Sequence, residues 1–226
     1  MRMSAWVPRF LIVLFVGLIG YSILSIAVGE SGPRAQQIGG VNDVQRIFGG
    51  IQQNGAYLGE EDAPVTVTVF NDIQCADCAA YQVDEIDPLV EPYVRPGDVR
   101  MELIHISTIA RNSTVAGIAS AAASLQDRGW QYADTFVRNF EGFDQSVGKD
   151  ELTDVADSVP ELEIEGWEAA LDGDEAQQIA EADAQLAIDL GLDDQPAVEV
   201  SGPSDEVLLD DSPSSEEIEA AIEDVA

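Results

Sequence analysis

Apolar and polar residues alternate along two short segments of the chain, and this period of two predicts β-strands. Residues 64–70 alternate and are rich in β-branched side chains, and residues 99–106 carry a second such pattern. From residue 75 to about residue 94 the apolar positions instead form the stripe of a helix, which Pro88 should kink. The first half of the chain therefore predicts a strand, a helix and a second strand.

A long helical block follows these elements. Residues 114–126 are rich in Ala and Ile and predict a buried helix, and the helical pattern continues from residue 130 to residue 190. The aromatic residues of this block fit the buried face of packed helices better than a ligand site; they are Trp130, Tyr132, Phe136 and Phe140.

The last part of the chain returns to strands. Residues 196–200 and 206–209 predict two short strands around a Ser-Gly-Pro turn. A final helix is expected from Pro213, with Ser212 as its N-cap. The order of elements predicts an α/β fold, in which helices cover a mixed sheet and a helical insertion interrupts it at about residues 108–190.

The N-terminal segment predicts a membrane anchor. Residues 10–28 contain no charge, and nineteen residues are about enough to cross the roughly 30 Å core of a bilayer as a helix. Arg2 and Arg9 precede this segment and Glu30 follows it. We therefore expect residues 1–9 in the cytoplasm and the remainder of the chain outside the cell membrane.

A cleaved signal peptide is the alternative interpretation, because Ala27-Val28-Gly29 has the small residues of a cleavage site. Both interpretations export the rest of the chain. Residues 29–58 are rich in Gly and Gln and predict a linker with one short helix, and residues 59–226 predict the globular domain.

The exported part is strongly acidic. Residues 31–226 carry 42 acidic and eight basic residues, a net charge of −34. Such a surface has no basic patch to neutralise phosphates, which excludes nucleic acid and anionic lipid as partners. Self-repulsion of this size favours the interpretation of an extracellular domain from a salt-loving microbe, with an ordinary acidic secreted domain as the alternative.

The only two cysteines, Cys75 and Cys78, stand where the first strand gives way to the helix. A cysteine at a helix N-terminus meets unpaired backbone N–H groups and the positive end of the helix dipole, and both stabilise a thiolate. The second cysteine, one turn later, can close a disulfide with the first. This arrangement favours an exchange-active disulfide on the oxidising side of the membrane, and no cofactor is expected.

Two other uses of the cysteines are open at this point. A zinc site normally needs four ligands, and the chain adds only His105 to the two cysteines. We interpret His105 as a strand-end residue with a satisfied hydrogen bond, and we expect no metal. A permanently closed structural disulfide would stabilise little, because its loop is very short.

The chain resembles membrane-anchored, DsbA-like thioredoxin-fold proteins over residues 59 to about 225. The motifs that carry the resemblance are GEEDAPV at 59–65, VFNDIQCADC at 69–78 and GLDDQPAVEVSG at 191–202. The resemblance implies a thioredoxin fold with an inserted helical domain. It also implies that Cys75 is the attacking thiol, that Cys78 resolves the mixed disulfide, and that Pro196 is a cis-proline facing them. By the same resemblance, the backbone of Gln195 would pair with a substrate peptide as an added strand.

Several positions depart from the usual family pattern. Ala76 replaces the frequent proline after the first cysteine, and Asp77 stands where strong oxidants often carry histidine. Gln195 replaces a threonine or valine, and Val69 replaces a carboxylate that many thioredoxins use to move a proton. We expect Ala76 and Asp77 to tune the redox activity of the pair.

Together these features predict an exported, membrane-tethered thiol–disulfide oxidoreductase. Its partners would be cysteine-containing protein substrates and a membrane redox protein that recycles the cysteine pair. Oxidation of substrates is favoured over reduction by the resemblance and the compartment. The alternative is a non-enzymatic binding or scaffold domain on the same fold, with a structural or vestigial disulfide.

The charge predicts that stability depends on salt. Thermal midpoints measured from about 0.1 to 3 M KCl should rise well beyond the gain of a near-neutral relative, because the Debye length falls to roughly 3 Å near 1 M and carboxylate repulsion is then screened. A flat profile would contradict the halophilic interpretation.

Overall fold

The computed structural model describes residues 38–106, 113–143, 147–192 and 196–226. Within them, no helix has both the length and the apolar character needed to cross a membrane. Residues 10–28 lie outside the described ranges, so the predicted anchor stays a prediction.

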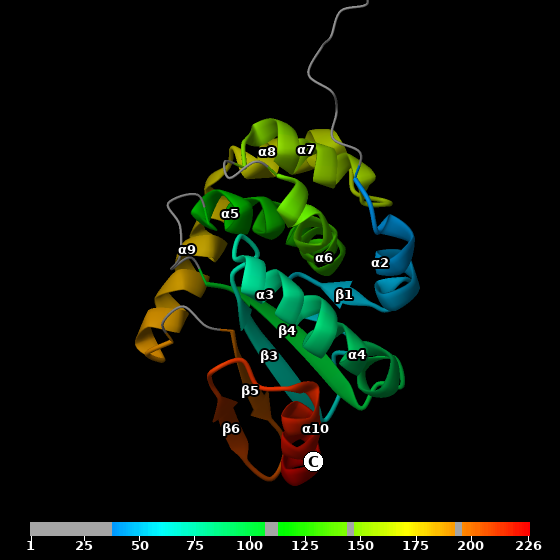
Figure 1. Ribbon diagram of the computed structural model, residues 1–226, viewed down its shortest axis with the longest axis vertical. Helices are drawn as coiled ribbons and strands as arrows, with labels where there is room; N and C mark the ends of the chain where they lie inside the picture. Colours follow the sequence, from blue (N-terminus) through cyan, green and yellow to red (C-terminus); the bar gives the residue numbers. More distant parts are fainter. Residues whose placement is uncertain (1–37, 107–112, 144–146, 193–195) are drawn as a thin grey trace, which may run out of the picture. The chain divides into compact units, whose positions relative to one another are not determined.

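A mixed sheet of six strands organises the described chain (Figure 1). Its order is β1-β2-β4-β3-β5-β6, and only the central pair β3 and β4 is parallel. The strands are β1 (Gln53–Asn54), β2 (Tyr57–Leu58), β3 (Val65–Asn71), β4 (Val99–His105), β5 (Ala197–Ser201) and β6 (Glu206–Leu209). The predicted strands are therefore present, and β3 lies in the middle of the sheet with a partner on each side.

The two faces of the sheet bury different clusters. On one face β3 buries Val65, Val67 and Val69 in the main core. The opposite face, at the carboxyl end of β3, carries a smaller buried cluster formed by Phe70, Ile104, Ile106, Ala187, Leu192 and Ala197. Side chains alternate between faces along a strand, so the valines of β3 share the main core, and Phe70 at its carboxyl end is buried on the opposite face.

A continuous helical run follows the strand–helix turn. It consists of α3 (Ala76–Tyr81), the π-helical segment η1 (Gln82–Ile86), α4 (Asp87–Leu89) and the π-helical segment η2 (Val90–Val94). Pro88 has no N–H for the ordinary helical bond and its ring crowds the preceding turn. The two widened turns lie on either side of it, as expected for a helix that accommodates proline.

The predicted helical insertion is confirmed. It contains α5 (Ser113–Ser124), α6 (Gly129–Asn139), the 3₁₀ turn η3 (Phe140–Gly142), α7 (Lys149–Ser158), α8 (Ile164–Leu171) and α9 (Asp174–Asp189). Helix α6 is its centre, because it packs on α5 and α7 and also on α2 and α3. Trp130, Tyr132 and Phe136 on α6 are fully buried, as their pattern predicted.

Residues 41–58, within the expected linker, carry ordered structure. Helix α2 (Val41–Phe48) buries Val44 and Phe48 in the main core, and β1 and β2 extend the sheet beside β4. Arg95 of the segment after η2 donates hydrogen bonds to the carbonyl oxygens of Arg46, Ile47 and Gly49. These bonds satisfy carbonyls at the end of α2 that have no partner within the helix.

The last helix, α10 (Ser215–Val225), begins two residues later than expected. Its N-cap is Ser214 and not Ser212, because the Ser214 side chain accepts from the backbone N–H of Glu217 while Glu217 accepts from Ser214 N. This reciprocal pair is a capping box. Helix α10 is also tied to the helix of the cysteines, since Tyr81 donates to Pro213 O at 2.8 Å and Ser215 N donates to the Glu85 carboxylate at 2.6 Å.

Gly202 should be intolerant of any side chain. A Cβ atom at this position would lie 2.4 Å from the carbonyl oxygen of Val225, at the end of α10. We expect Gly202→Ala to lower the free energy of unfolding by about 1–3 kcal/mol, because backbone must move to relieve the clash. The control is Gly39→Ala, whose Cβ would have Asn139 Oδ1 as nearest neighbour at 3.7 Å. Equal effects of the two substitutions in denaturant unfolding would contradict this packing.

Candidate active site

The turn after β3 places Cys75 at the start of α3. Cys75 N donates to Asp72 O at 3.1 Å, and Gln74 N donates to the Asp72 carboxylate at 2.9 Å. Cys75 then takes an extended conformation (φ −105°, ψ 127°) and acts as the N-cap of α3, its sulfur accepting from Cys78 N at 3.1 Å. The Asp72 turn thus delivers the first cysteine to the helix N-terminus, where the sequence predicted it.

Cys75 and Cys78 form a disulfide, with their Cα atoms 5.1 Å apart. Cys75 is partly exposed, whereas Cys78 has no exposed surface. An incoming thiolate therefore has access to the sulfur of Cys75 and not to that of Cys78. Ala76 and Asp77, between the cysteines, are both exposed.

Beneath Cys78 lies Asn71, a residue that the sequence analysis did not single out. It is the last residue of β3 and is fully buried. Its Nδ2 donates to the carbonyl oxygen of Cys78 at 3.2 Å and to Gln82 Oε1 at 3.5 Å, a weaker contact. Its Oδ1 is buried and has no hydrogen-bond partner within the described ranges.

Gln82 extends this contact into a buried polar network. Its Nε2 donates to Asp87 Oδ1 at 3.3 Å. Arg138 of α6 pairs with Asp87 and, through Nε at 2.7 Å, with Asp134. The network links the backbone of Cys78 to the helical insertion.

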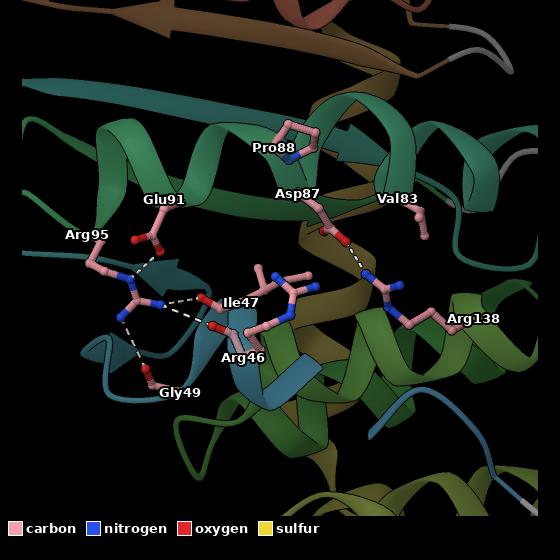
Figure 2. A pocket seen from close by; sticks show the side chains of 9 residues that line it. All are labelled: Arg46, Ile47, Gly49, Val83, Asp87, Pro88, Glu91, Arg95 and Arg138. Carbon is pink, nitrogen blue, oxygen red and sulfur yellow. Dashed lines mark hydrogen bonds and ion pairs between the residues drawn. The ribbon is translucent and has the colours of Figure 1, made fainter. Parts of the chain in front are cut away.

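The far end of the network opens on a cavity of about 750 Å³ between α2, the helical run and α6 (Figure 2). Figure 2 shows Arg95 bonded to Glu91 and to the end of α2, and Arg138 bonded to Asp87. Neither cysteine lines this cavity. The surface around the partly exposed Cys75 is therefore separate from this cavity.

His105 ends β4, as predicted, and is buried. Its Nε2 lies 2.6 Å from Ser120 Oγ. Burial lowers the pKa of His105 to about 4, so the ring is neutral near pH 7. The hydrogen bond expected of His105 is present, and within the described ranges no group of three or more His, Cys, Asp or Glu side chains is arranged to hold a metal ion.

Pro196 lies at the same end of the sheet as the turn that carries Cys75. It is buried and precedes β5, whose first residue, Ala197, pairs with Phe70 of β3. Its carbonyl oxygen accepts from Ser212 N at 2.8 Å. Gln195 lies outside the described residues, so the cis peptide bond and the substrate-pairing backbone stay predictions.

A family model described as thioredoxin matches residues 52–224. The chain belongs to this thioredoxin family. A Bacillus anthracis protein called "Probable disulfide bond formation protein D" is 28% identical over 154 residues, which cover 64% of this chain and 69% of that protein.

Solved structures agree on the fold. Oxidised BdbD from Bacillus subtilis superimposes with a TM-score of 0.66 at 23% identity, covering 77% of this chain and 96% of BdbD. Wolbachia pipientis α-DsbA1 gives a TM-score of 0.64 at 13% identity, covering 75% and 89%. The predicted thioredoxin fold with a helical insertion is confirmed, and so is the DsbA-like thiol–disulfide oxidoreductase class.

The buried network should make stability depend on pH through Asp87. Burial, together with the nearby charge of Asp134, raises the pKa of Asp87 to about 8. Since the folded chain keeps this proton to a higher pH than the unfolded chain, Asp87 contributes stability that is lost as pH rises from about 4 to about 8. Asp87→Asn cannot ionise, so its stability relative to wild type should improve with pH, by on the order of 2 kcal/mol between pH 5 and 9.

Denaturant unfolding at fixed salt over this pH range is the measurement. Asp84→Asn is the matched control, because it removes one exposed carboxylate from the same helical run. A difference between Asp87→Asn and wild type that stays constant across the range would contradict the account.

Proposed function

We propose that the chain oxidises cysteine pairs of proteins outside the cytoplasmic membrane, using Cys75 and Cys78 as its redox centre. The observation that carries this proposal is the disulfide between a partly exposed N-cap cysteine and a fully buried cysteine one turn later. The printed name of the Bacillus anthracis relative, a probable disulfide bond formation protein, supports the oxidative direction.

The proposed reaction is two successive thiol–disulfide exchanges. A substrate thiolate attacks Cys75 Sγ, the Cys75–Cys78 bond breaks, and its electron pair leaves on Cys78 Sγ, which takes up a proton. The second substrate thiolate then attacks the substrate sulfur of the mixed disulfide and releases Cys75 as a thiolate. The substrate gains a disulfide, the enzyme is reduced by two electrons, and one of the two substrate protons ends on Cys78 while the other goes to solvent.

Cys75 is suited to leave in the second step. Its sulfur already accepts the backbone N–H of Cys78 at the helix N-terminus, and such a bond favours a thiolate over a thiol. Asp77 opposes this effect, because a like charge close to Cys75 disfavours the thiolate. We infer that Ala76 and Asp77 hold the pair below the strongest oxidants of its class.

Substrate binding is assigned to the segment before β5. In this proposal Gln195 and Pro196 face the cysteine pair, and the backbone of Gln195 pairs with an extended substrate segment. The position of Pro196 at the sheet end that carries the Cys75 turn supports this assignment.

The proposed location is the outer side of the cell membrane, with residues 10–28 as a single anchor, residues 1–9 in the cytoplasm and residues 59–226 as the extracytoplasmic domain. The apolar segment and the positive charges before it support this topology. A membrane redox protein would reoxidise the cysteine pair after each cycle. No nucleic acid is involved.

Trapping tests the exchange chemistry. In a Cys78→Ser variant the mixed disulfide on Cys75 has no resolving thiol, so we expect covalent adducts with exported proteins that reducing agent releases on a gel. Cys75→Ser is the matched control and should trap far less, because Cys78 is buried. Absence of adducts in Cys78→Ser would favour a scaffold domain with a vestigial disulfide.

A further inference from the structure

The amide oxygen of Asn71 is a buried acceptor that no described residue of the oxidised protein fills. Asn71 is fully buried, and both contacts of its Nδ2 run to acceptors, Cys78 O and Gln82 Oε1. Those two acceptors fix which end of the amide is nitrogen, because nitrogen is its only donor. The oxygen is therefore buried with no donor to it among the residues that the structure describes.

An unfilled buried acceptor is unfavourable and rare, and where one persists beside a reactive group it calls for an explanation. The reactive group here is Cys78, whose own backbone the same amide contacts at 3.2 Å. Cys78 has no exposed surface, so water cannot reach its sulfur from outside.

Reduction of the disulfide adds a hydrogen-bond donor at Cys78. As a disulfide sulfur, Cys78 has no hydrogen to donate. Once a substrate thiolate has broken the disulfide and the leaving sulfur has taken up its proton, Cys78 carries an S–H group, which is a weak donor. The reduced protein then holds a new buried donor on Cys78, the residue whose backbone carbonyl the Asn71 amide already contacts.

We propose that Asn71 Oδ1 accepts a hydrogen bond from the Cys78 thiol in the reduced protein and thereby shifts the redox equilibrium towards the dithiol. This inference rests on the proposed function, because it concerns the same cysteine pair. Asn71 favours reduction because its oxygen is unsatisfied in the oxidised form and satisfied in the reduced form. Val69, two residues earlier on the same face of β3, offers no polar group for this task.

His105 is the rival acceptor. It pairs in register with Asn71 across the parallel strands β3 and β4, and its Nδ1 is also buried, with no partner in the described part of the chain. Its other nitrogen is bonded to Ser120, on α5. Asn71 is the better candidate because it already contacts Cys78, whereas the described contacts of His105 run to α5 and α9.

The first test is the equilibrium of the full chain with glutathione. Asn71→Leu keeps the size of the side chain and removes its polar atoms. We expect the equilibrium to shift about tenfold towards the disulfide, which is about 30 mV downward for a two-electron couple. The matched control is Thr68→Val, a polar-to-apolar change on the same strand but the opposite face, which should leave the equilibrium within about twofold of wild type.

The second test needs no change at Asn71. The chain has only two cysteines, so Cys75→Ser leaves Cys78 as its single thiol. The S–H stretching band of this variant, measured by Raman spectroscopy, should lie at the lower frequency of a hydrogen-bonded thiol and should move up when Asn71→Leu is added.

Three results would overturn the proposal. They are a band at the free-thiol frequency in Cys75→Ser, a lowered band that Asn71→Leu does not move, and a redox equilibrium that Asn71→Leu leaves unchanged. The second of these would assign the bond to another acceptor such as His105. Neither measurement uses a protein substrate, so a failure of the proposed function, seen as an absence of trapped adducts, would be distinguishable from a failure here.

Discussion

The junction between β3 and α3 determines the geometry of the cysteine pair, because it must present one sulfur to solvent and bury the other within a single helical turn. Strand β3 is held on both sides, by β4 over its whole length and by β5 over five residues. The turn at Asp72 then connects β3 to α3, whose N-cap is Cys75. A strand fixed in the middle of the sheet gives the cysteine pair a rigid base, which an edge strand would not provide.

The same junction connects the cysteines to the insertion. Asn71 and Gln82 bond beneath α3, Gln82 bonds Asp87, and Arg138 of α6 joins Asp87 to Asp134. A buried ionic group of this kind is weak evidence for added stability, because burying the charges costs about as much as their attraction returns. Its clearer effect is to fix how α6 sits against the helix that carries Cys78.

Sequence periodicity predicted the parts of the fold that are locally encoded. The β-branched alternation of residues 64–70, the two short strands after residue 196 and the long helical block all appear in the structure. The strands β1 and β2 were not predicted, because two residues each are too few for any period to show. The sequence was enough to predict Ser214 as the N-cap of the last helix, since Ser214 and Glu217 have the spacing of a capping box.

The candidate site, like the fold, was only partly predictable from the sequence. The spacing of Cys75 and Cys78 after a strand marks the pair in the sequence itself. The network under Cys78 does not: Asn71 comes from β3, Gln82 and Asp87 come from the helical run, and the packing of α6 against that run brings Arg138 to Asp87. Each of these residues alone is an ordinary polar residue of a strand or helix, so no local pattern could have identified it.

The reduction potential of the Cys75–Cys78 pair, measured by glutathione titration of the full chain, tests the central claim most directly. The account predicts a value less negative than the about −270 mV of thioredoxin, since the pair is proposed to oxidise its substrates, and more negative than the about −120 mV of DsbA, since Asp77 is proposed to disfavour the Cys75 thiolate. A potential at or below about −270 mV would mean that the pair is a reductant, and would contradict the account.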